Sequence, residues 1–397
     1  MINKVKNIAK KHVEKVINVR RYLHANPELS FKEYQTSKFI QSILKENKIP
    51  FTNNHVKTGI IATIKGNNPS IKEIILRADM DALPIQEENN LDYKSKNDGL
   101  MHACGHDVHS ASLIGTALIL NELKDEFEGT IKLVFQPGEE KLPGGAKLMI
   151  EDGLLKNKPI ACIAQHVYPE LPVGKVGFRS GLYMASADEL HVTINGKGGH
   201  AALPHLLNDP VLMCSQIISS LQQIISRNNK PNNPSVLSFG YVNADGETNI
   251  IPDFVKLRGT FRTFDEKWRF TAHEKMKKIA NAICESAGGS CEFDIKVGYP
   301  SLINNDKVTE DAKASAERYL GGENIINLDL RMTSEDFAYV SQASPSCFYR
   351  IGTGDGNSVK RLHTSKFDID EKIFTISSGL MAYIALEKLI NNLHKLE

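Results

Sequence analysis

Apolar residues recur at helical spacing along the opening of the chain. Val5, Ile8, Ala9, Val13 and Val16 fall on one face of a helix, so the pattern predicts an amphipathic opening helix. Further helices are expected over residues 33–48, 105–125 and 143–154.

Short apolar runs separate these helical stretches and predict strands over residues 60–65, 74–78, 131–135 and 160–165. Strands that alternate with helices indicate the α/β class, with a largely parallel, helix-covered sheet. Ligands bind at the carboxyl ends of such strands. The loops after Ala78, Phe135 and Gln165 are therefore the expected places for chemistry.

The pattern changes between residues 185 and 298. Leu190, Val192 and Ile194 alternate like a half-buried strand, and Asn208 or Asp209 could cap the next helix. The whole segment reads β-α-β-β-α-β, with helices over 210–226 and 266–286 and strands over 190–194, 235–242, 254–263 and 291–296. We expect an inserted ferredoxin-like α+β domain over 185–298, within a catalytic domain made of 1–184 and 299–397.

Composition narrows the function classes. The 397 residues are 41% apolar and 24% charged with a net charge of +1, so neither nucleic acid nor a strongly acidic partner is expected. The six cysteines include no C-x-x-C pair, which favours reduced thiols. The start lacks the features of a secretory signal, and we find no unbroken run of about eighteen apolar residues. We therefore expect a cytoplasmic protein without a membrane span.

The densest group of ligand-type residues is residues 101–109, MHACGHDVH. Cys104 and His106 fall in a turn that opens a predicted helix, where the positive helix end favours a thiolate. A thiolate and an imidazole two residues apart suit a transition metal better than Mg²⁺ or Ca²⁺. Taken alone, a small buried cysteine among polar histidines explains this segment equally well.

Further donors follow other predicted strands. Glu139 and Glu140 end the segment 135–140, FQPGEE, and His166 follows the run 160–165. His363 comes after a strand-like segment and a glycine-containing loop at 352–356. Each is weak evidence alone, since a glutamate pair is usually solvated and a lone histidine usually structural. Together, Cys104, His106, Glu140, His166 and His363 provide enough donors for two metal ions bridged by one ligand and sharing a water.

Six motifs resemble the M20 metallopeptidase and amidohydrolase family, and cover nearly the whole chain in order. They are LHANPELS (23–30), RADMDALP (77–84), HACGHDVH (102–109), FQPGEE (135–140), GGHAALP (198–204) and TSEDF (333–337). More narrowly they are similar to its cysteine-containing branch, which includes aminoacylases, hippurate hydrolases, auxin-conjugate hydrolases and N-acetyldiaminopimelate deacetylases.

The resemblance implies a role for each donor. Cys104 would bridge two divalent metal ions, and His106, Glu140, His166 and His363 would be the other ligands. Glu139 would be the general base, taking a proton from the bridging water and passing it to the departing amine. Zn²⁺ or Mn²⁺ is expected, with Co²⁺ and Ni²⁺ open.

Many relatives have a ligand histidine where this chain has Arg77, which cannot bind a metal, so His106 would take that place. Asp79 would orient a ligand histidine or be a simple turn carboxylate. Glu335 and Asp336 are expected near the site without an assigned role.

The inserted domain adds three candidates by the same resemblance. His200 would reach the active site of a partner subunit in a homodimer formed through this domain, and there stabilise the oxyanion. Asn249 and Arg262 would hold the carboxylate of the substrate. The simpler alternatives are an exposed histidine, a turn asparagine and a surface arginine.

The leading hypothesis is metal-dependent hydrolysis of N-acyl amino acids, and a dipeptidase or carboxypeptidase of the same family is the near alternative. A different enzyme would use Cys104 as nucleophile with His106 or His109 as base, but this leaves Glu140, His166 and His363 unexplained. A binding protein without turnover is a third hypothesis. The sequence does not specify the acyl group.

Overall fold

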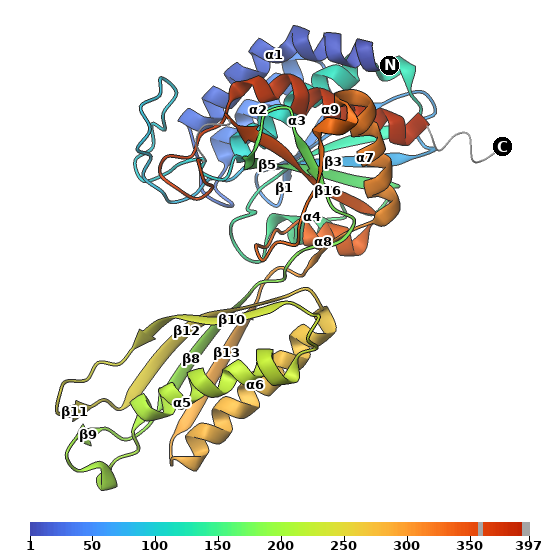
Figure 1. Ribbon diagram of the computed structural model, residues 1–397. Helices are drawn as coiled ribbons and strands as arrows, with labels where there is room; N and C mark the ends of the chain where they lie inside the picture. Colours follow the sequence, from blue (N-terminus) through green and yellow to red (C-terminus); the bar gives the residue numbers. More distant parts are fainter. Residues whose placement is uncertain (356–359, 391–397) are drawn as a thin grey trace. The chain divides into compact units, whose positions relative to one another are not determined.

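The computed structural model describes residues 1–355 and 360–390. It divides into two compact units (Figure 1). Unit 1 comprises residues 1–181, 303–329 and 336 onward, and unit 2 comprises residues 182–302 and 330–335.

Unit 1 is built on a sheet of eight strands in the order β1-β2-β4-β3-β5-β16-β6-β15. Their bounds are β1 Phe51–His55, β2 Gly59–Lys65, β3 Glu73–Asp79, β4 Thr130–Gln136, β5 Ala161–Pro172, β6 Val176–Phe178, β15 Ile325–Asn327 and β16 Ser346–Gly354. The central strands β4, β3, β5 and β16 run parallel, whereas β1, β2 and β6 pair antiparallel. The expected α/β class with a mainly parallel sheet is confirmed.

Helices cover both faces of this sheet. Their bounds are α1 Ile2–Ala25, α2 Tyr34–Glu46, α3 His106–Glu122, α4 Gly145–Glu151, α7 Asp306–Leu320, α8 Ala338–Ala343 and α9 Phe374–Ile390. Helices α3 and α9 lie against one face with α1 packed on them, and α4 and α8 lie on the other (Figure 1). All seven residues of β3 are consequently buried, which explains the apolar run Ile74–Leu76 on successive positions.

The segment Glu371–Ile390, which includes α9, is long and apolar enough to cross a membrane by length and composition alone. The sequence expectation overlooked it, because charged residues interrupt its apolar run. Within unit 1, 78% of its most apolar window is buried, and α9 contacts α1, α3 and α7. Burial in the core therefore accounts for its apolar character.

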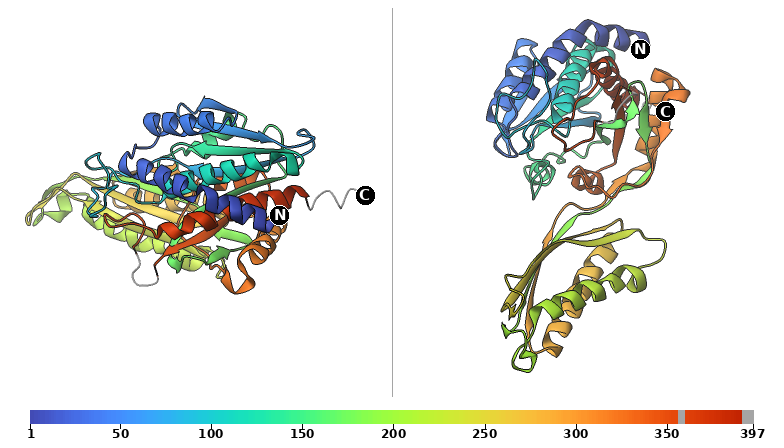
Figure 2. Two further views of the ribbon diagram at one scale, coloured as in Figure 1. Left: turned by 90° about the horizontal axis from the view of Figure 1, so that it is seen from above. Right: turned by 60° about the vertical axis from the view of Figure 1, so that its left-hand side comes forward.

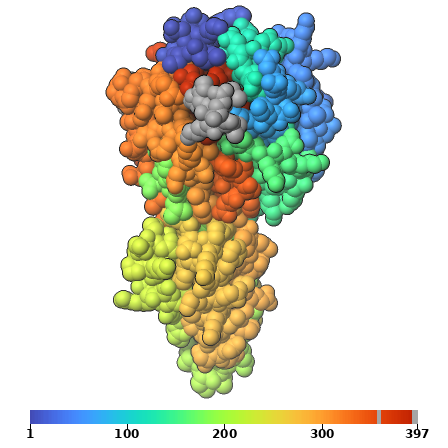
Figure 3. Space-filling model, turned by 90° about the vertical axis from the view of Figure 1, so that its right-hand side faces the viewer, coloured from blue at the N-terminus to red at the C-terminus, as the bar shows by residue number. Residues whose placement is uncertain are grey.

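Unit 2 contains a four-stranded antiparallel sheet in the order β10-β12-β8-β13. Its elements are β8 Asp188–Asn195, α5 Pro210–Gln223, β10 Ser235–Asn243, β12 Phe254–Thr263, α6 Glu266–Ser286 and β13 Ser290–Val297. Both helices lie on one face of the sheet (Figures 1 and 2), and α6 forms a long stretch of the surface in Figure 3. The β-α-β-β-α-β order matches the predicted ferredoxin-like pattern.

Local signals explain the elements of unit 2. Leu190, Val192 and Ile194 are buried under the helices, as their alternation predicts. Asp209 caps α5 by accepting hydrogen bonds from the backbone N–H groups of Val211 and Leu212. Two short strands, β9 Gly199–His200 and β11 Ile250–Ile251, pair antiparallel at the end of the sheet where β12 begins. The remaining strands are β7 Gly181–Met184 and β14 Leu302–Asn304.

Candidate metal centre

The carboxyl ends of the central strands of unit 1 meet at one edge of the sheet. Asp79, the last residue of β3, lies opposite Gln136, the last residue of β4. The turn after β4 carries Glu139 and Glu140, while the loop before α3 carries Cys104. His166 lies inside β5 rather than at its end, because β5 continues to pair with β16 after β3 has stopped.

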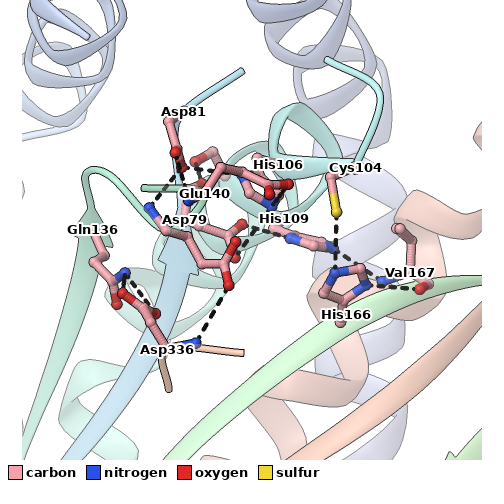
Figure 4. Close-up of polar contacts among 12 residues, drawn as sticks. Asp79, Asp81, Cys104, His106, His109, Gln136, Glu140, His166, Val167 and Asp336 are labelled. Atoms are coloured by element: carbon pink, nitrogen blue, oxygen red, sulfur yellow. Dashed lines mark hydrogen bonds and ion pairs between the residues drawn. The ribbon is translucent and has the colours of Figure 1, made fainter. Parts of the chain in front are cut away.

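Cys104 belongs to two groups of candidate ligands, and Figure 4 shows its sulfur next to His166. It forms one group with His106 and His166, and a second group with Glu140 and His363, with all donor atoms of each group within 4.8 Å of one another. Its Sγ lies 3.5 Å from His166 Nε2 and 3.3 Å from His363 Nε2. The five donors predicted from sequence are thus brought together, with Cys104 common to both groups.

The rings of His106 and His166 are held through their Nδ1 atoms, which leaves their Nε2 atoms facing the cluster. His106 Nδ1 lies 3.2 Å from Asp81 Oδ1, and His166 Nδ1 lies 2.8 Å from the carbonyl oxygen of Val167. Each Nδ1 is therefore the donor nitrogen, and each Nε2 keeps a lone pair for a metal.

Two buried atoms of the cluster fit the binding of a cation. His106 Nε2 has no hydrogen-bond partner within residues 1–355 and 360–390, and Glu140 Oε1 lies 3.1 Å from His363 Nε2, a nitrogen that could share a metal with it. Leaving a buried polar atom such as His106 Nε2 unsatisfied costs about 1–3 kcal/mol. A thiol, imidazoles and a carboxylate around these atoms match the ligands of Zn²⁺ and similar transition metals.

His363 reaches the cluster from a turn with a left-handed backbone, φ 58°. Its backbone N–H donates to the carbonyl of Ala103, which holds the turn beside Cys104. The contacts of its ring with Cys104 Sγ and Glu140 raise the pKa of His363 to about 10. Residues 356–359, part of the glycine-containing loop expected before it, lie outside the described residues.

Glu139 lies beside the donors and is 6% exposed. Its carboxylate shares a group with His106 and Glu140, and its Oε1 is 3.3 Å from the backbone nitrogen of Asp336. The side chains of the two adjacent glutamates thus border the same space, as a base next to a metal ligand requires.

Sequence analysis did not assign the buried polar network around these residues. Asp336 accepts hydrogen bonds from Arg77, Gln136 and the backbone N–H of Ala146, which joins β3, β4 and α4. Figure 4 shows the contact of Asp336 with Gln136. Arg77 also donates to Asp79. Arg77 is therefore structural, as its failure to bind metals implied. Glu335 is buried as well, but the structure assigns it no function.

Asp79 contacts His109, which is not among the predicted ligand histidines. Its Oδ1 lies 2.6 Å from His109 Nδ1, whereas its Oδ2 lies 3.8 Å from His106 Nε2. Despite full burial, which raises the pKa of an acid, His106, Arg77 and His109 hold the pKa of Asp79 well below its usual value. The residue that contacts the outer nitrogen of His106 is Asp81, and the Asp-Met-Asp spacing was its only sequence signal.

His109 is not placed to activate Cys104. Its Nδ1 pairs with Asp79, and its Nε2 accepts the backbone N–H of Val167 at 3.0 Å. Both ring nitrogens are engaged, so the ring has no free site for a proton from the thiol. This removes one of the two bases considered for a nucleophilic cysteine.

The three candidates of unit 2 do not converge. His200 pairs with Ile250 across the β9–β11 ladder, and the backbone N–H of Ala201 donates to the carbonyl of Asn249, so these two exposed residues are neighbours. Arg262 lies near the opposite end of β12, about 25 Å along a strand rising ~3.3 Å per residue. There it contacts Thr260, Ser334 and the carbonyl of Met332.

Comparison with known proteins identifies the family. The model of peptidase family M20/M25/M40 matches residues 75–387. The chain belongs to this family. As a member it is a hydrolase of the amidohydrolase and peptidase type, and the expected resemblance is confirmed.

Individual relatives of the family cover nearly the whole chain. The N-acetylcysteine deacetylase of Bacillus subtilis is 40% identical over 94% of this chain and 96% of its own. Thermostable carboxypeptidase 2 of Saccharolobus solfataricus is 35% identical over 98% of each. The crystal structure of the YXEP protein of Bacillus subtilis, a dinuclear metal-binding peptidase of the M20 family, superposes with a TM-score of 0.83 at 38% identity, covering 96% of this chain and 99% of its own.

Proposed function

We propose that this M20 hydrolase cleaves the amide bond of N-acyl amino acids with two divalent metal ions. The observation that carries the proposal is the convergence of four side chains on Cys104 beside the buried carboxylate of Glu139. The similarity to an N-acetylcysteine deacetylase supports this substrate class. The similarity to a carboxypeptidase supports a second candidate, cleavage of short peptides, which releases the same kind of product.

In this proposal Cys104, His106 and His166 would hold one ion, and Cys104, Glu140 and His363 would hold the other. When bound, the two ions polarise the amide carbonyl and lower the pKa of the attacking water. Glu139 accepts a proton from that water as it attacks, and later delivers a proton to the departing amine. The backbone N–H of Asp336 helps to keep the Glu139 carboxylate in place.

The remaining predicted roles belong to the same proposal. Arg262, Asn249 and His200 bind the substrate carboxylate or the oxyanion, with His200 acting across a homodimer. Zn²⁺ or Mn²⁺ is the proposed metal, with Co²⁺ or Ni²⁺ as alternatives. The cytoplasm is the proposed compartment, supported by six unpaired cysteines.

Substitution Glu139→Gln tests the general base. We expect kcat to fall by roughly 10²–10⁴-fold, because the amide cannot accept the proton. Metal content, measured by elemental analysis, should stay at two ions per chain because Glu139 is not a ligand in this proposal. A panel of N-acetyl, N-benzoyl and indole-acetyl amino acids and dipeptides would serve as substrates, with release of the amino acid as the readout.

The matched control is Glu151→Gln, which changes an exposed glutamate at the end of α4. It should retain the activity of the unmodified protein. Full activity of Glu139→Gln would remove Glu139 from the mechanism. Binding of panel compounds without any product, by the metal-loaded protein, would favour the binding protein over the enzyme.

A further inference from the structure

Three successive backbone N–H groups of the turn Gly138-Glu139-Glu140 donate to two buried carboxyl groups from distant parts of the chain. Gly138 N donates to Glu33 Oε1 at 2.9 Å. Glu139 N and Glu140 N donate to the two oxygens of Asp81, at 3.1 and 2.9 Å. Asp81 is 1% exposed and Glu33 is fully buried. Figure 4 shows Asp81 beside Glu140 and His106.

The four partners of Asp81 all donate. Its Oδ1 accepts from Glu139 N and lies 3.2 Å from His106 Nδ1, the protonated nitrogen of that ring. Its Oδ2 accepts from Glu140 N and from the hydroxyl of Ser30 at 2.6 Å. Both oxygens must therefore be acceptors. An asparagine at this position would turn an NH₂ group toward two donors.

Glu33 has a different set of partners. Its Oε1 accepts from the backbone N–H groups of Phe31 and Gly138, at 2.8 and 2.9 Å. Its Oε2 lies 2.7 Å from the hydroxyl of Thr58, which can donate or accept. Burial and the nearby Asp81 raise the pKa of Glu33 to about 7. Only Oε1 must be an acceptor, so a glutamine with its NH₂ group toward Thr58 satisfies the same partners.

We propose that Asp81 and Glu33 are positioning residues that together fix the turn of Glu139 and Glu140, with Asp81 also orienting His106. Asp81 contacts two proposed ligands, His106 and Glu140, and through them it controls metal binding. Glu33 acts through Gly138 and so controls the placement of Glu139. The proposal rests on the proposed function, since it assigns Glu139 and Glu140 the roles given there.

The first experiment measures metal affinity without substrate. The unmodified protein and three variants, all prepared without metal, would compete with a chromophoric chelator for Zn²⁺ and Mn²⁺. The variants are Asp81→Asn, Ser30→Ala and Glu87→Gln. We expect Asp81→Asn to bind at least about 10-fold more weakly, as loss of an orienting contact of a ligand does. Ser30→Ala removes one of the four donors and should weaken binding by only a few-fold. Glu87→Gln, a buried glutamate that contacts His24, Asn89 and Ser95, should not change the affinity.

The second experiment compares Glu33→Gln with Glu33→Leu at saturating metal on the most rapidly cleaved compound of the panel. Glu33→Gln should stay within about 3-fold of the unmodified kcat because its amide preserves the acceptor. Glu33→Leu has no acceptor, and a displacement of the base by about 1 Å costs up to 10²-fold in rate. We expect its kcat to fall at least 10-fold with an unchanged KM, since no substrate-binding group moves.

Unmodified metal affinity in a folded Asp81→Asn would overturn the assignment of Asp81, and equal kcat values for Glu33→Gln and Glu33→Leu would overturn that of Glu33. If Asp81→Asn does not fold, as circular dichroism would show, Ser30→Ala decides the assignment of Asp81, and an unchanged metal affinity in that variant would overturn it. The proposed function fails in a different way: the unmodified protein would then bind no metal pair or cleave no amide.

Discussion

In the proposed metal site, a metal would have to displace protons from Cys104 and His363. Burial, followed by the charge of Glu140, raises the pKa of the Cys104 thiol, and contacts with Cys104 and Glu140 raise the pKa of His363 to about 10. A folded-state pKa above the ordinary value of 6.5 means that the protonated His363 stabilises the metal-free protein fully below pH 6.5. That contribution is lost as the pH rises through about 10.

Metal affinity should therefore rise with pH between about 6 and 9, because binding requires a thiolate and a neutral imidazole. For the ion that Cys104, Glu140 and His363 would hold, the slope of log affinity against pH should correspond to the release of at least two protons. Substitution His363→Ala should reduce that slope by about one proton. Chelator competition at several pH values measures both slopes, and equal slopes would contradict protonation of His363.

Single residues also show which contacts the sequence alone did not predict. Glu139, Glu140 and His166 were recognised because each follows a predicted strand. Asp79 and Asp81 are equally acidic and only two residues apart, yet one contacts His109 and the other His106. That choice depends on the approach of α3 to the end of β3, which the local pattern does not encode.

At the scale of elements, the helices α1, α3 and α9 pack closely at Gly115 of α3. A Cβ added at this glycine would lie 2.2 Å from Ser378 Oγ and 2.9 Å from Val16 Cγ2. The position of α3 also sets the position of the proposed ligand His106, which is its first residue.

Substitution Gly115→Ala should destabilise the protein by about 1–3 kcal/mol through overpacking. Urea unfolding of the apo protein measures this change in the free energy of unfolding. The matched control is Gly322→Ala, where no atom lies within 4 Å of the added Cβ. The control should stay within about 0.5 kcal/mol of the unmodified protein. Equal stability of the two variants would show that the helices separate easily.

At the scale of the whole molecule, a buried ionic cluster stabilises unit 2. Asp188, at the start of β8, accepts hydrogen bonds from Arg269 and from the backbone N–H of Gly298, and lies 2.7 Å from His273 Nε2. Asp188 and Arg269 are each 1% exposed. The cluster joins α6 to the start of β8 and to the residue that follows β13.

Substitution Asp188→Asn should destabilise unit 2 by about 3–5 kcal/mol, because the buried Arg269 then keeps only the more exposed Glu266 as an anionic partner. Calorimetry should resolve two transitions if the units unfold separately. Metal at about 100 times its Kd should raise the free energy of unfolding of unit 1 by ~2.7 kcal/mol, and so raise the temperature of its transition. The substitution should lower the transition temperature of unit 2. A single transition moved by both would contradict independent units.

The predicted action of His200 across a homodimer is testable by mixing two inactive variants. If His200 acts on the partner, hybrids of Glu139→Gln and His200→Ala contain one complete site. Random mixing makes half of the dimers hybrid, so about a quarter of the unmodified activity should return. The readout is amide cleavage after subunit exchange, with sedimentation to establish the dimer. No recovery in a proven hybrid would place His200 outside the partner site.

The sequence by itself determined the α/β class, the ferredoxin-like order of unit 2 and the five candidate ligands, because each depends on local periodicity or on a residue type with distinctive chemistry. Apolar alternation placed Leu190, Val192 and Ile194 correctly in the core. Strand ends indicated where Glu140 would lie, since parallel strands bring their carboxyl ends to one edge.

Only the tertiary structure decided how those residues are held. Glu33 and Asp81 meet the same turn from 105 and 59 residues earlier in the chain, as their hydrogen bonds to Gly138 and Glu140 show. The sequence also did not predict that Arg262 and His200 lie near opposite ends of β12. Hydrogen bonds between distant segments depend on packing in three dimensions, and a single sequence records the donors and acceptors without their pairing.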